Sequence, residues 1–248
     1  MLTQAAKLAL APLLLWQGAQ VRRRALRLPE AAGARSGLAG SGELRLRLLI
    51  VGDSSGAGVG AATQEEALAG RLSRALADRL GGAVHWQLRA TTGHLSRDAL
   101  AELRLAELQP ADVLVTALGV NDVVGQVSPR RWLATLSEID ALARQRAGVR
   151  YTLHSAVPPM HAFPLLPQPL RWLMGAQALR MNRALGRALF GDAGRGLQAL
   201  PPDLHGAAAA RLMAEDGFHP GPAGYALWAE TLAERIAKEM QRQRLKSH

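Results

Sequence analysis

The segment VGDSSGAGVG, residues 51–60, has the composition of a site rather than of a core, with two serines, four glycines and one aspartate. It directly follows the alternating and then apolar run ELRLRLLIVG, which is typical of a strand. A serine at the end of a strand is exposed, and its small neighbours let the backbone turn tightly. Outward N–H groups at the start of a following helix can bind an anion. Ser54 is therefore a candidate nucleophile.

Two other interpretations of this segment need no nucleophile. Its glycines do not match the G-x-G-x-x-G dinucleotide pattern, and it lacks the lysine of a Walker phosphate loop. The second interpretation is structural, because Ser54 or Ser55 would also serve as a helix cap.

A candidate base lies far away in the sequence, in EDGFHPGPAGYALWAE, before a helix expected to begin near Pro222. Asp216 and His219 are three residues apart, a spacing at which a carboxylate can hydrogen-bond an imidazole and fix its tautomer. The other ring nitrogen can then face a serine hydroxyl. The remaining histidines are expected to be surface or capping residues, with His161 in reserve as a base: His85, His94, His154, His161, His205 and His248.

The elements that must position these residues alternate between strand and helix. Strands are predicted over 43–52, 83–90, 112–119 and 149–156. A capping box over Thr63 to Glu66 predicts a first helix reaching about Leu80, and further helices are predicted from Ser96 and from Ser128-Pro129. Strand followed by helix implies an α/β fold with a parallel sheet, whose crevice lies beyond the carboxyl ends of the strands. Ser54, Gly93, Asn121 and the loop after Ser155 should meet there.

The blocks VGDSS, Gly93, GVND and DGFHP, in this order and spacing, resemble the SGNH/GDSL hydrolase family of esterases and lipases over residues 43–237. The resemblance implies a flavodoxin-like three-layer α/β/α fold with Ser54 as nucleophile, His219 as base and Asp216 as its partner. It also implies an oxyanion hole made by the Ser54 and Gly93 backbone N–H groups and the Asn121 side-chain amide. Esters would then be cleaved through an acyl-enzyme without a cofactor or metal.

Some of these residues also have plain structural interpretations. Asn121 suits an Asx-type turn, and Gly93 suits any turn that requires a positive φ. Asp53 and Asp122, which flank the motif residues, are expected to brace their turns.

Composition limits the class of protein. The 248 residues, 48% of them hydrophobic, suit one compact α/β domain, and the absence of cysteine excludes disulfides, thiolate metal sites and a thiol nucleophile. The net charge of +10 gathers at the two ends, because residues 41–234 hold 19 Lys or Arg against 18 Asp or Glu. Basic ends suit contact with an anionic membrane surface, or plain solvation, better than a nucleic-acid groove.

The N-terminal segment has an apolar stretch from Leu8 to Trp16, short of the roughly 20 residues that span a bilayer. Arg22, Arg23 and Arg24 follow it, and a secretory leader would carry its charges before the apolar stretch. A membrane-surface anchor, a processed leader and a plain helix all stay open. A membrane-associated or cytoplasmic location is expected, with an exported form as the alternative. The predicted divisions are residues 1–42 with a linker over 25–42, a hydrolase domain over 43–237, and a basic tail over 238–248.

The loop after the fourth strand bears on the substrate. It is apolar and carries five prolines, and it forms either an acyl-binding wall or ordinary packing from Met160, Phe163, Leu165, Leu166, Leu170, Trp172 and Leu173. The following helix should bury Leu179, Met181, Leu185 and Leu189. A small-molecule acyl ester or lysophospholipid-like lipid is the expected substrate, with acetyl esters of sugars next. A non-hydrolytic binding module and a basic adaptor are the rival functions.

Overall fold

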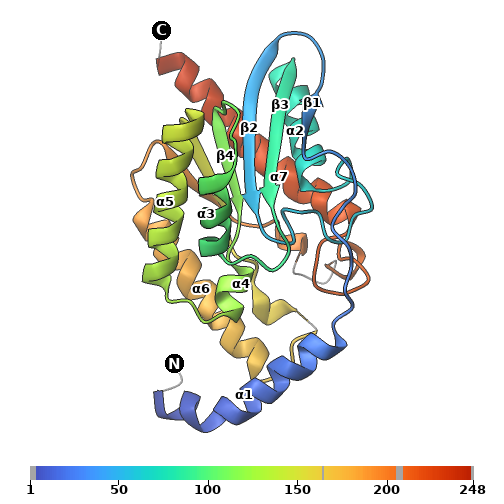
Figure 1. The fold of residues 1–248 in the computed structure, drawn as a ribbon, viewed down its shortest axis with the longest axis vertical. Coiled ribbons are helices and arrows are strands. Elements are labelled where there is room, and N and C mark those ends of the chain that lie inside the picture. Colours follow the sequence, from blue (N-terminus) through green and yellow to red (C-terminus); the bar gives the residue numbers. More distant parts are fainter. Residues whose placement is uncertain (1–3, 164, 205–208, 247–248) are drawn as a thin grey trace.

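A six-stranded sheet with the strand order β1-β3-β2-β4-β5-β6 runs through the computed structural model, which describes residues 4–163, 165–204 and 209–246 (Figure 1). β1 pairs antiparallel with β3, and every other pairing is parallel. The strands are β1 Ser36–Ala39, β2 Leu44–Gly52, β3 Ala83–Ala90, β4 Val113–Ala117, β5 Tyr151–Ser155 and β6 Arg195–Gln198.

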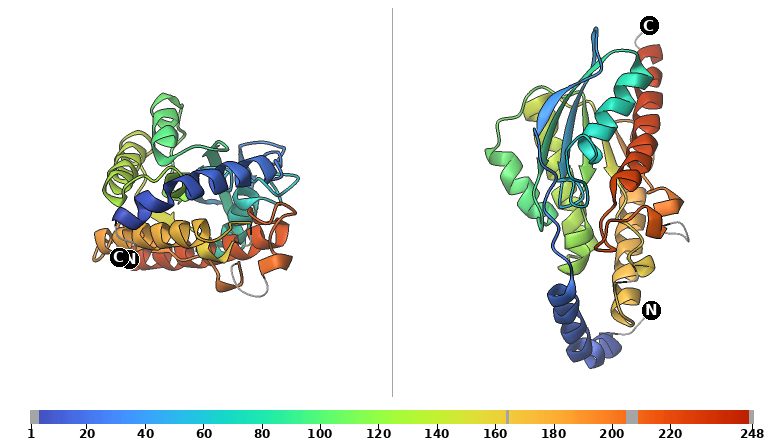
Figure 2. Two further views of the ribbon diagram at one scale, coloured as in Figure 1. Left: turned by 90° about the horizontal axis from the view of Figure 1, so that it is seen from below. Right: turned by 90° about the vertical axis from the view of Figure 1, so that its right-hand side faces the viewer.

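Helices cover both faces of the sheet (Figure 2). The helices of the described residues are α1 Gln4–Arg24, α2 Leu68–Leu80, α3 Ser96–Leu105, α4 Val120–Val124, α5 Pro129–Ala147, α6 Leu170–Ala188 and α7 Pro222–Lys246. Short 3₁₀ turns occupy Met160–Ala162, Pro202–Leu204 and Ala209–Arg211. α2 and α7 pack on one face, and α3, α5 and α6 on the other.

The apolar run of β2 shows why two layers of helices are needed. Leu48 and Ile50 pack into the core under α2 and α7, while Leu49 and Val51 pack into the core under α3, α5 and α6. Successive side chains of a strand point to opposite faces, so a strand that is buried on both faces is apolar throughout. The predicted three-layer α/β/α class is confirmed.

The four predicted strands and the helices from Ser96 and Ser128-Pro129 are confirmed, with every boundary within two residues. Ser128 caps α5, because its Oγ accepts a hydrogen bond from the Arg131 N–H at 3.4 Å. The prediction of a capping box at Thr63 is wrong. The chain makes a turn there, and α2 begins at Leu68 without a side-chain cap. Part of the expected linker is also not a linker, since residues 36–39 form the edge strand β1.

The first and the last of the described residues both lie in helices. Leu8 to Trp16 lie within α1, and α7 runs across position 238 as far as Lys246. The predicted divisions at 42/43 and 237/238 stay predictions. His205 and His248 lie outside the described residues.

Two expectations about single residues are wrong. His154 is a core residue of β5, 1% exposed, rather than a surface or capping residue. Leu179 of α6 is 48% exposed, whereas Met181, Leu185 and Leu189 are buried as predicted.

Candidate active site

Ser54 lies on a tight turn at the carboxyl end of β2. The turn is closed by hydrogen bonds from the Ala57 N–H to the Asp53 carbonyl at 2.8 Å and from the Val59 N–H to the Ser54 carbonyl at 3.0 Å. The helix expected to follow this turn lies farther along the chain, because α2 begins only at Leu68. The hydroxyl is therefore presented by a turn, without the N-terminus of a helix behind it.

Gly60 shows why this turn needs glycine. Its φ is +98°, and a Cβ at this position would lie 2.4 Å from the Pro220 carbonyl oxygen and 3.4 Å from the His219 Cβ. Only a residue without a side chain lets the turn after Ser54 approach the segment that carries His219 so closely. Gly60 thus brings two distant parts of the sequence together.

A continuous hydrogen-bonded chain joins three of the predicted site residues. His219 Nε2 lies 2.8 Å from Ser54 Oγ, and His219 Nδ1 lies 2.6 Å from Asp216 Oδ2. The other carboxylate oxygen, Asp216 Oδ1, accepts the Phe218 N–H at 2.9 Å and the His219 N–H at 3.0 Å. The loop that carries the imidazole is thereby folded around the carboxylate that orients it.

The electrostatics of Asp216 favour its charged form. Burial raises its pKa, but hydrogen bonds from the His219 ring and from the His219 and Phe218 backbone outweigh burial, so its pKa lies below its ordinary value. An ionised Asp216 keeps a proton on Nδ1 of His219. In that tautomer Nε2 carries a lone pair that faces the Ser54 hydroxyl.

The predicted oxyanion residues lie at the ends of the neighbouring strands. Gly93 follows β3 with φ +86° and open space where a Cβ would be, so the backbone angle, not crowding, requires glycine. Asn121, on the short helix α4 after β4, donates from Nδ2 to the His94 carbonyl at 2.9 Å. An amide nitrogen has two hydrogens, so one stays available. Among the described residues, the Ser54 and Gly93 N–H groups have no acceptor.

Both flanking aspartates are buried, each 2% exposed. Asp53 Oδ1 accepts the Ser55 N–H at 3.1 Å and so braces the turn, as predicted. Asp122 Oδ2 accepts the N–H of Ser96 at 3.1 Å and its hydroxyl at 2.7 Å, which ties α4 to the start of α3. Burial raises the pKa of Asp53 to about 7 against the Ser55 hydrogen bond, with Asp122 adding in the same direction. Burial also raises the pKa of Asp122.

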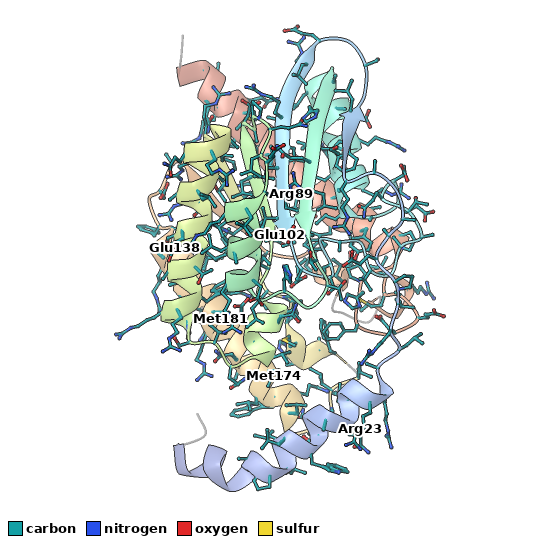
Figure 3. The ribbon with its side chains drawn as sticks, in the orientation of Figure 1. Arg23, Arg89, Glu102, Glu138, Met174 and Met181 are labelled. Atoms are coloured by element: carbon teal, nitrogen blue, oxygen red, sulfur yellow. The ribbon has the colours of Figure 1, made fainter. Side chains whose placement is uncertain are left out.

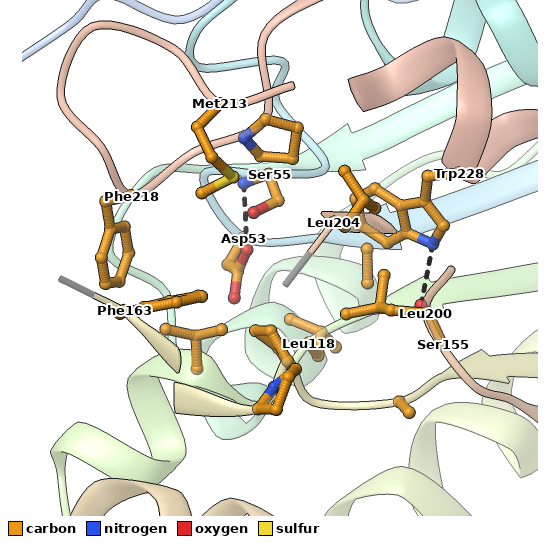
Figure 4. A pocket seen from close by; sticks show the side chains of 16 residues that line it. Asp53, Ser55, Leu118, Ser155, Phe163, Leu200, Leu204, Met213, Phe218 and Trp228 are labelled. Atoms are coloured by element: carbon orange, nitrogen blue, oxygen red, sulfur yellow. Dashed lines mark hydrogen bonds between the residues drawn. The ribbon is translucent and has the colours of Figure 1, made fainter. Parts of the chain in front are cut away.

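A pocket of about 60 Å³ opens beside this turn (Figure 4). The two neighbours of Ser54 line it, Asp53 and Ser55, as do the two neighbours of His219, Phe218 and Pro220. The rest of its wall is largely apolar and includes Leu118, Pro158, Pro159, Phe163, Leu200, Leu204, Met213 and Trp228. A group held at Ser54 would have this pocket at its side.

Of the seven apolar residues expected as a wall or as packing, most pack in the core. Met160, Leu166, Leu170 and Leu173 are buried under α3, α5 and α6, and Trp172 is 42% exposed. Phe163 lines the pocket and meets Phe218 edge-on, with ring centroids 5.0 Å apart. Phe218 in turn meets the His219 ring edge-on at 5.1 Å, so the loop after β5 contacts the histidine segment.

His161 is exposed on the 3₁₀ turn Met160–Ala162 and packs its backbone against Gly175 of α6. No contact between it and Ser54 occurs in the described part of the chain, so the structure does not bring the reserve base to the site. In residues 4–163, 165–204 and 209–246, no three His, Asp or Glu side chains are grouped to hold a metal ion.

The family of GDSL-like lipases and acylhydrolases matches residues 50–227, the part of the chain that runs from β2 into α7. The chain belongs to this family. The resemblance seen in the four sequence blocks is thus confirmed. A GDSL-like esterase of Mycobacterium tuberculosis is 26% identical over 194 residues, which are 75% of this chain and 60% of that protein.

Solved structures agree with the GDSL-like fold. TesA superposes with a TM-score of 0.60 at 23% identity, covering 78% of this chain and 99% of TesA. Est24, a carbohydrate acetylesterase from Sinorhizobium meliloti, gives a TM-score of 0.55 at 18% identity, covering 78% of this chain and 99% of Est24.

The GDSL-like site has support that the sequence did not reveal. Glu30 Oε1 accepts the Thr92 N–H at 2.7 Å, directly before Gly93, although Glu30 lies in the expected linker. The Ala31 N–H donates to the Ala57 carbonyl at 3.2 Å, and Gln64 Nε2 donates to the carbonyls of Ala31 and Ala57, both at 3.1 Å. Contacts with the backbone of distant segments leave no motif in the sequence, so only the structure reveals them.

Proposed function

We propose that this GDSL-family chain hydrolyses carboxylic esters with Ser54 as nucleophile, His219 as general base and Asp216 as the residue that orients and stabilises the imidazole. One observation carries the proposal: the unbroken hydrogen-bonded chain Ser54 Oγ, His219 and Asp216, with distances of 2.8 Å and 2.6 Å. Family membership supports the reaction class.

The mechanism follows from which atom each residue offers. Ser54 Oγ attacks the ester carbonyl while its proton moves to His219 Nε2, and the imidazolium so formed is stabilised by ionised Asp216. His219 Nε2 then gives this proton to the leaving alcohol oxygen as the ester C–O bond breaks. The acyl group stays on Ser54 until a water, deprotonated by His219 Nε2, attacks its carbonyl carbon. The bond from that carbon to Ser54 Oγ then breaks, His219 returns the proton to Ser54 Oγ, and the acid is released.

The negative charge of each tetrahedral intermediate needs prealigned donors. The unpaired N–H groups of Ser54 and Gly93 and the remaining amide hydrogen of Asn121 fit this task. Removing one such donor typically lowers turnover by about 10²–10³-fold.

The leading substrate is a lipid or other acyl ester whose acyl group enters the pocket beside Ser54, because the wall of that pocket is largely apolar. Deacetylation of O-acetylated carbohydrate is the second candidate, supported by the small volume of the pocket and by the likeness to Est24. p-Nitrophenyl esters of two to sixteen carbons, assayed beside acetylated xylan, separate them. A maximum at medium or long chains favours the first candidate, and activity confined to acetyl groups favours the second. No hydrolysis of any ester contradicts the proposed function.

We also propose that α1 contacts an anionic membrane surface. Leu14, Gln17 and Val21 face the domain, and Gln17 bonds the Gln168 carbonyl at 2.7 Å and the Leu170 N–H at 3.3 Å. Leu13 and Trp16, which are 41% and 59% exposed, remain outside, with Arg23 near the end of the helix (Figure 3). No helix in the described residues has the length and apolarity to cross a bilayer.

The position of α1 gives this contact a direction. α1 lies beyond the carboxyl ends of the strands, the end of the sheet that carries Ser54, while α7 ends at the opposite extremity (Figures 1 and 2). Of the two basic ends of the chain, only the N-terminal one would then face the membrane. The end of the sheet that carries Ser54 would face the membrane as well. Exposed apolar groups beside arginines suit an anionic interface.

A further inference from the structure

The carboxyl group of Asp53 is buried with half of its hydrogen-bonding capacity unused. Its side chain is 2% exposed, and Oδ1 accepts the Ser55 N–H at 3.1 Å. Oδ2 is also shielded from solvent, and it has no partner among the described residues. In Figure 4 this carboxyl group points into the pocket, between Ser55 and Leu118.

The surroundings of Oδ2 offer little to satisfy it. The facing wall holds Leu118, Phe163 and Met213, and Ser155 Oγ, the hydroxyl further along, accepts the Trp228 Nε1–H at 3.0 Å. A buried polar atom without a partner is costly, and a site that holds one discriminates strongly in favour of a ligand that pairs with it. The pocket is therefore apolar in most of its wall, with polar side chains at Asp53, Ser55 and Ser155, and only Asp53 among them is charged when ionised.

We propose that this pocket binds an acyl group that carries a hydroxyl close to the ester carbonyl, and that Asp53 Oδ2 hydrogen-bonds that hydroxyl. The inference rests on the proposed function and names its substrate class. A hydroxyl both donates and accepts, so it pairs with Asp53 whether the carboxyl group is ionised or protonated. Because burial raises the pKa of Asp53 to about 7, both forms are available near neutral pH.

The position of the hydroxyl on the acyl chain follows from the covalent structure. Asp53 and Ser54 are consecutive, with Cα atoms about 3.8 Å apart, so a group at Asp53 is only a few bonds from the carbon that Ser54 attacks. We therefore assign the hydroxyl to the second or third carbon of the acyl group. The acyl group, not the alcohol, is the occupant because it takes part in both steps and is held on Ser54 between them, whereas the alcohol leaves after the first step.

The test compares p-nitrophenyl 2- and 3-hydroxybutyrate with p-nitrophenyl butyrate. Each kcat/KM is divided by the rate of that ester with hydroxide, which removes the intrinsic effect of the hydroxyl on reactivity. We expect wild-type protein to favour at least one hydroxylated ester by roughly 10-fold or more. Equal corrected values for the three esters would overturn the inference while leaving ester hydrolysis intact. No turnover of any of them contradicts the proposed function instead.

Two variants then assign the preference to Asp53. Asp53→Ala removes the carboxyl group, and in folded protein we expect the ratio of hydroxylated to plain ester to fall to about one, because effects on Ser54 itself cancel in a ratio. Asp122→Asn is the matched control, since Asp122 is equally buried but is held by Ser96 outside the pocket. We expect it to keep the wild-type ratio. A folded Asp53→Ala protein that keeps the preference overturns the inference, and if Asp53→Ala does not fold, the wild-type comparison decides.

Discussion

At the scale of single residues, His219 contacts Ser54 and Asp216 through different ring nitrogens, which makes the costs of substitution unequal. His219→Ala removes the proton acceptor, whereas Asp216→Asn leaves an imidazole that is wrongly oriented and less stabilised. We expect kcat to fall by roughly 10⁶-fold for His219→Ala and by about 10⁴-fold for Asp216→Asn. Steady-state kinetics on a short p-nitrophenyl ester measure both, and equal or reversed losses would indicate a different base.

The raised pKa of Asp53 predicts how the free energy of unfolding depends on pH. Its pKa is raised to about 7 by burial, so the folded protein binds a proton that the unfolded chain, with a pKa near 3.8, has already released. The stabilisation from this proton is complete below about pH 4 and is lost as the pH rises through 7, an upper bound of about 4 kcal/mol. Asp53→Asn cannot titrate. Relative to wild type it should therefore gain stability between pH 5 and pH 8 in urea unfolding, and a difference that does not change with pH would refute this.

The sequence could predict which residues lie together in the candidate site. Ser54, Asp216 and His219 are brought together as predicted, because a strand end and an i, i+3 spacing limit where such side chains can lie. The core position of His154 was not predictable, since its partners Thr116 Oγ1 at 2.8 Å and Asp140 Oδ2 at 3.3 Å are separated from it along the chain. The lack of a hydrogen-bond partner for Asp53 Oδ2 among the described residues was not predictable either, because it depends on which side chains the fold packs around that oxygen.

At the scale of elements, the turn after β2 depends on its contact with the segment that precedes α7. Gly60→Ala would force a Cβ to within 2.4 Å of the Pro220 carbonyl oxygen at a φ of +98°, and the His219 segment would have to move. We expect a stability loss of about 1–3 kcal/mol together with a fall of at least roughly 10²-fold in kcat/KM.

Gly81→Ala is the matched control for Gly60→Ala. Gly81 caps α2 with φ +65°, and a Cβ there would meet nothing within 4 Å. It should lose about 1 kcal/mol and keep its activity. If both variants retain wild-type kcat/KM, the turn does not position His219 as described.

Elements with strong periodicity were predictable, and those held by pairing alone were not. β2 and β3 follow from their apolar runs, whereas β1 has four residues, SGLA, that gain their strand conformation from pairing with β3. The start of α2 was misplaced because Thr63 and Glu66 match a capping box in spacing, while the backbone there follows contacts with Ala32 instead. In such cases a tertiary contact, and not the local sequence pattern, determines the backbone conformation.

At the scale of the whole molecule, α1 can be separated from the catalytic machinery only if the cut respects residues 30–39. Deletion of residues 1–40 would remove β1 and the contacts of Glu30 and Ala31 with the active-site loops. Deletion of residues 1–24 spares them. We expect the shorter deletion to retain hydrolysis of a soluble short-chain ester within about twofold, because every proposed catalytic residue lies elsewhere.

Unlike ester hydrolysis, binding to vesicles should depend on α1. Full-length protein should float with phosphatidylglycerol-containing vesicles, and both the 1–24 deletion and the Leu13→Ser, Trp16→Ser double variant should float markedly less. Leu105→Ser is the control, because Leu105 is 88% exposed but lies on α3. Equal flotation of all four proteins, or of none, would contradict the membrane contact.

Ser54 is the proposed activated nucleophile, and labelling with a serine-reactive fluorophosphonate tests this role most directly. Full-length protein is labelled, digested and mapped by mass spectrometry, with Ser54→Ala and the neighbouring Ser55→Ala as parallel samples of verified fold. We expect one phosphonylated residue, Ser54, in wild type and in Ser55→Ala, and no label in Ser54→Ala, because only Ser54 Oγ lies 2.8 Å from His219 Nε2. Label on another residue, or a folded wild-type protein that takes none, would contradict the account.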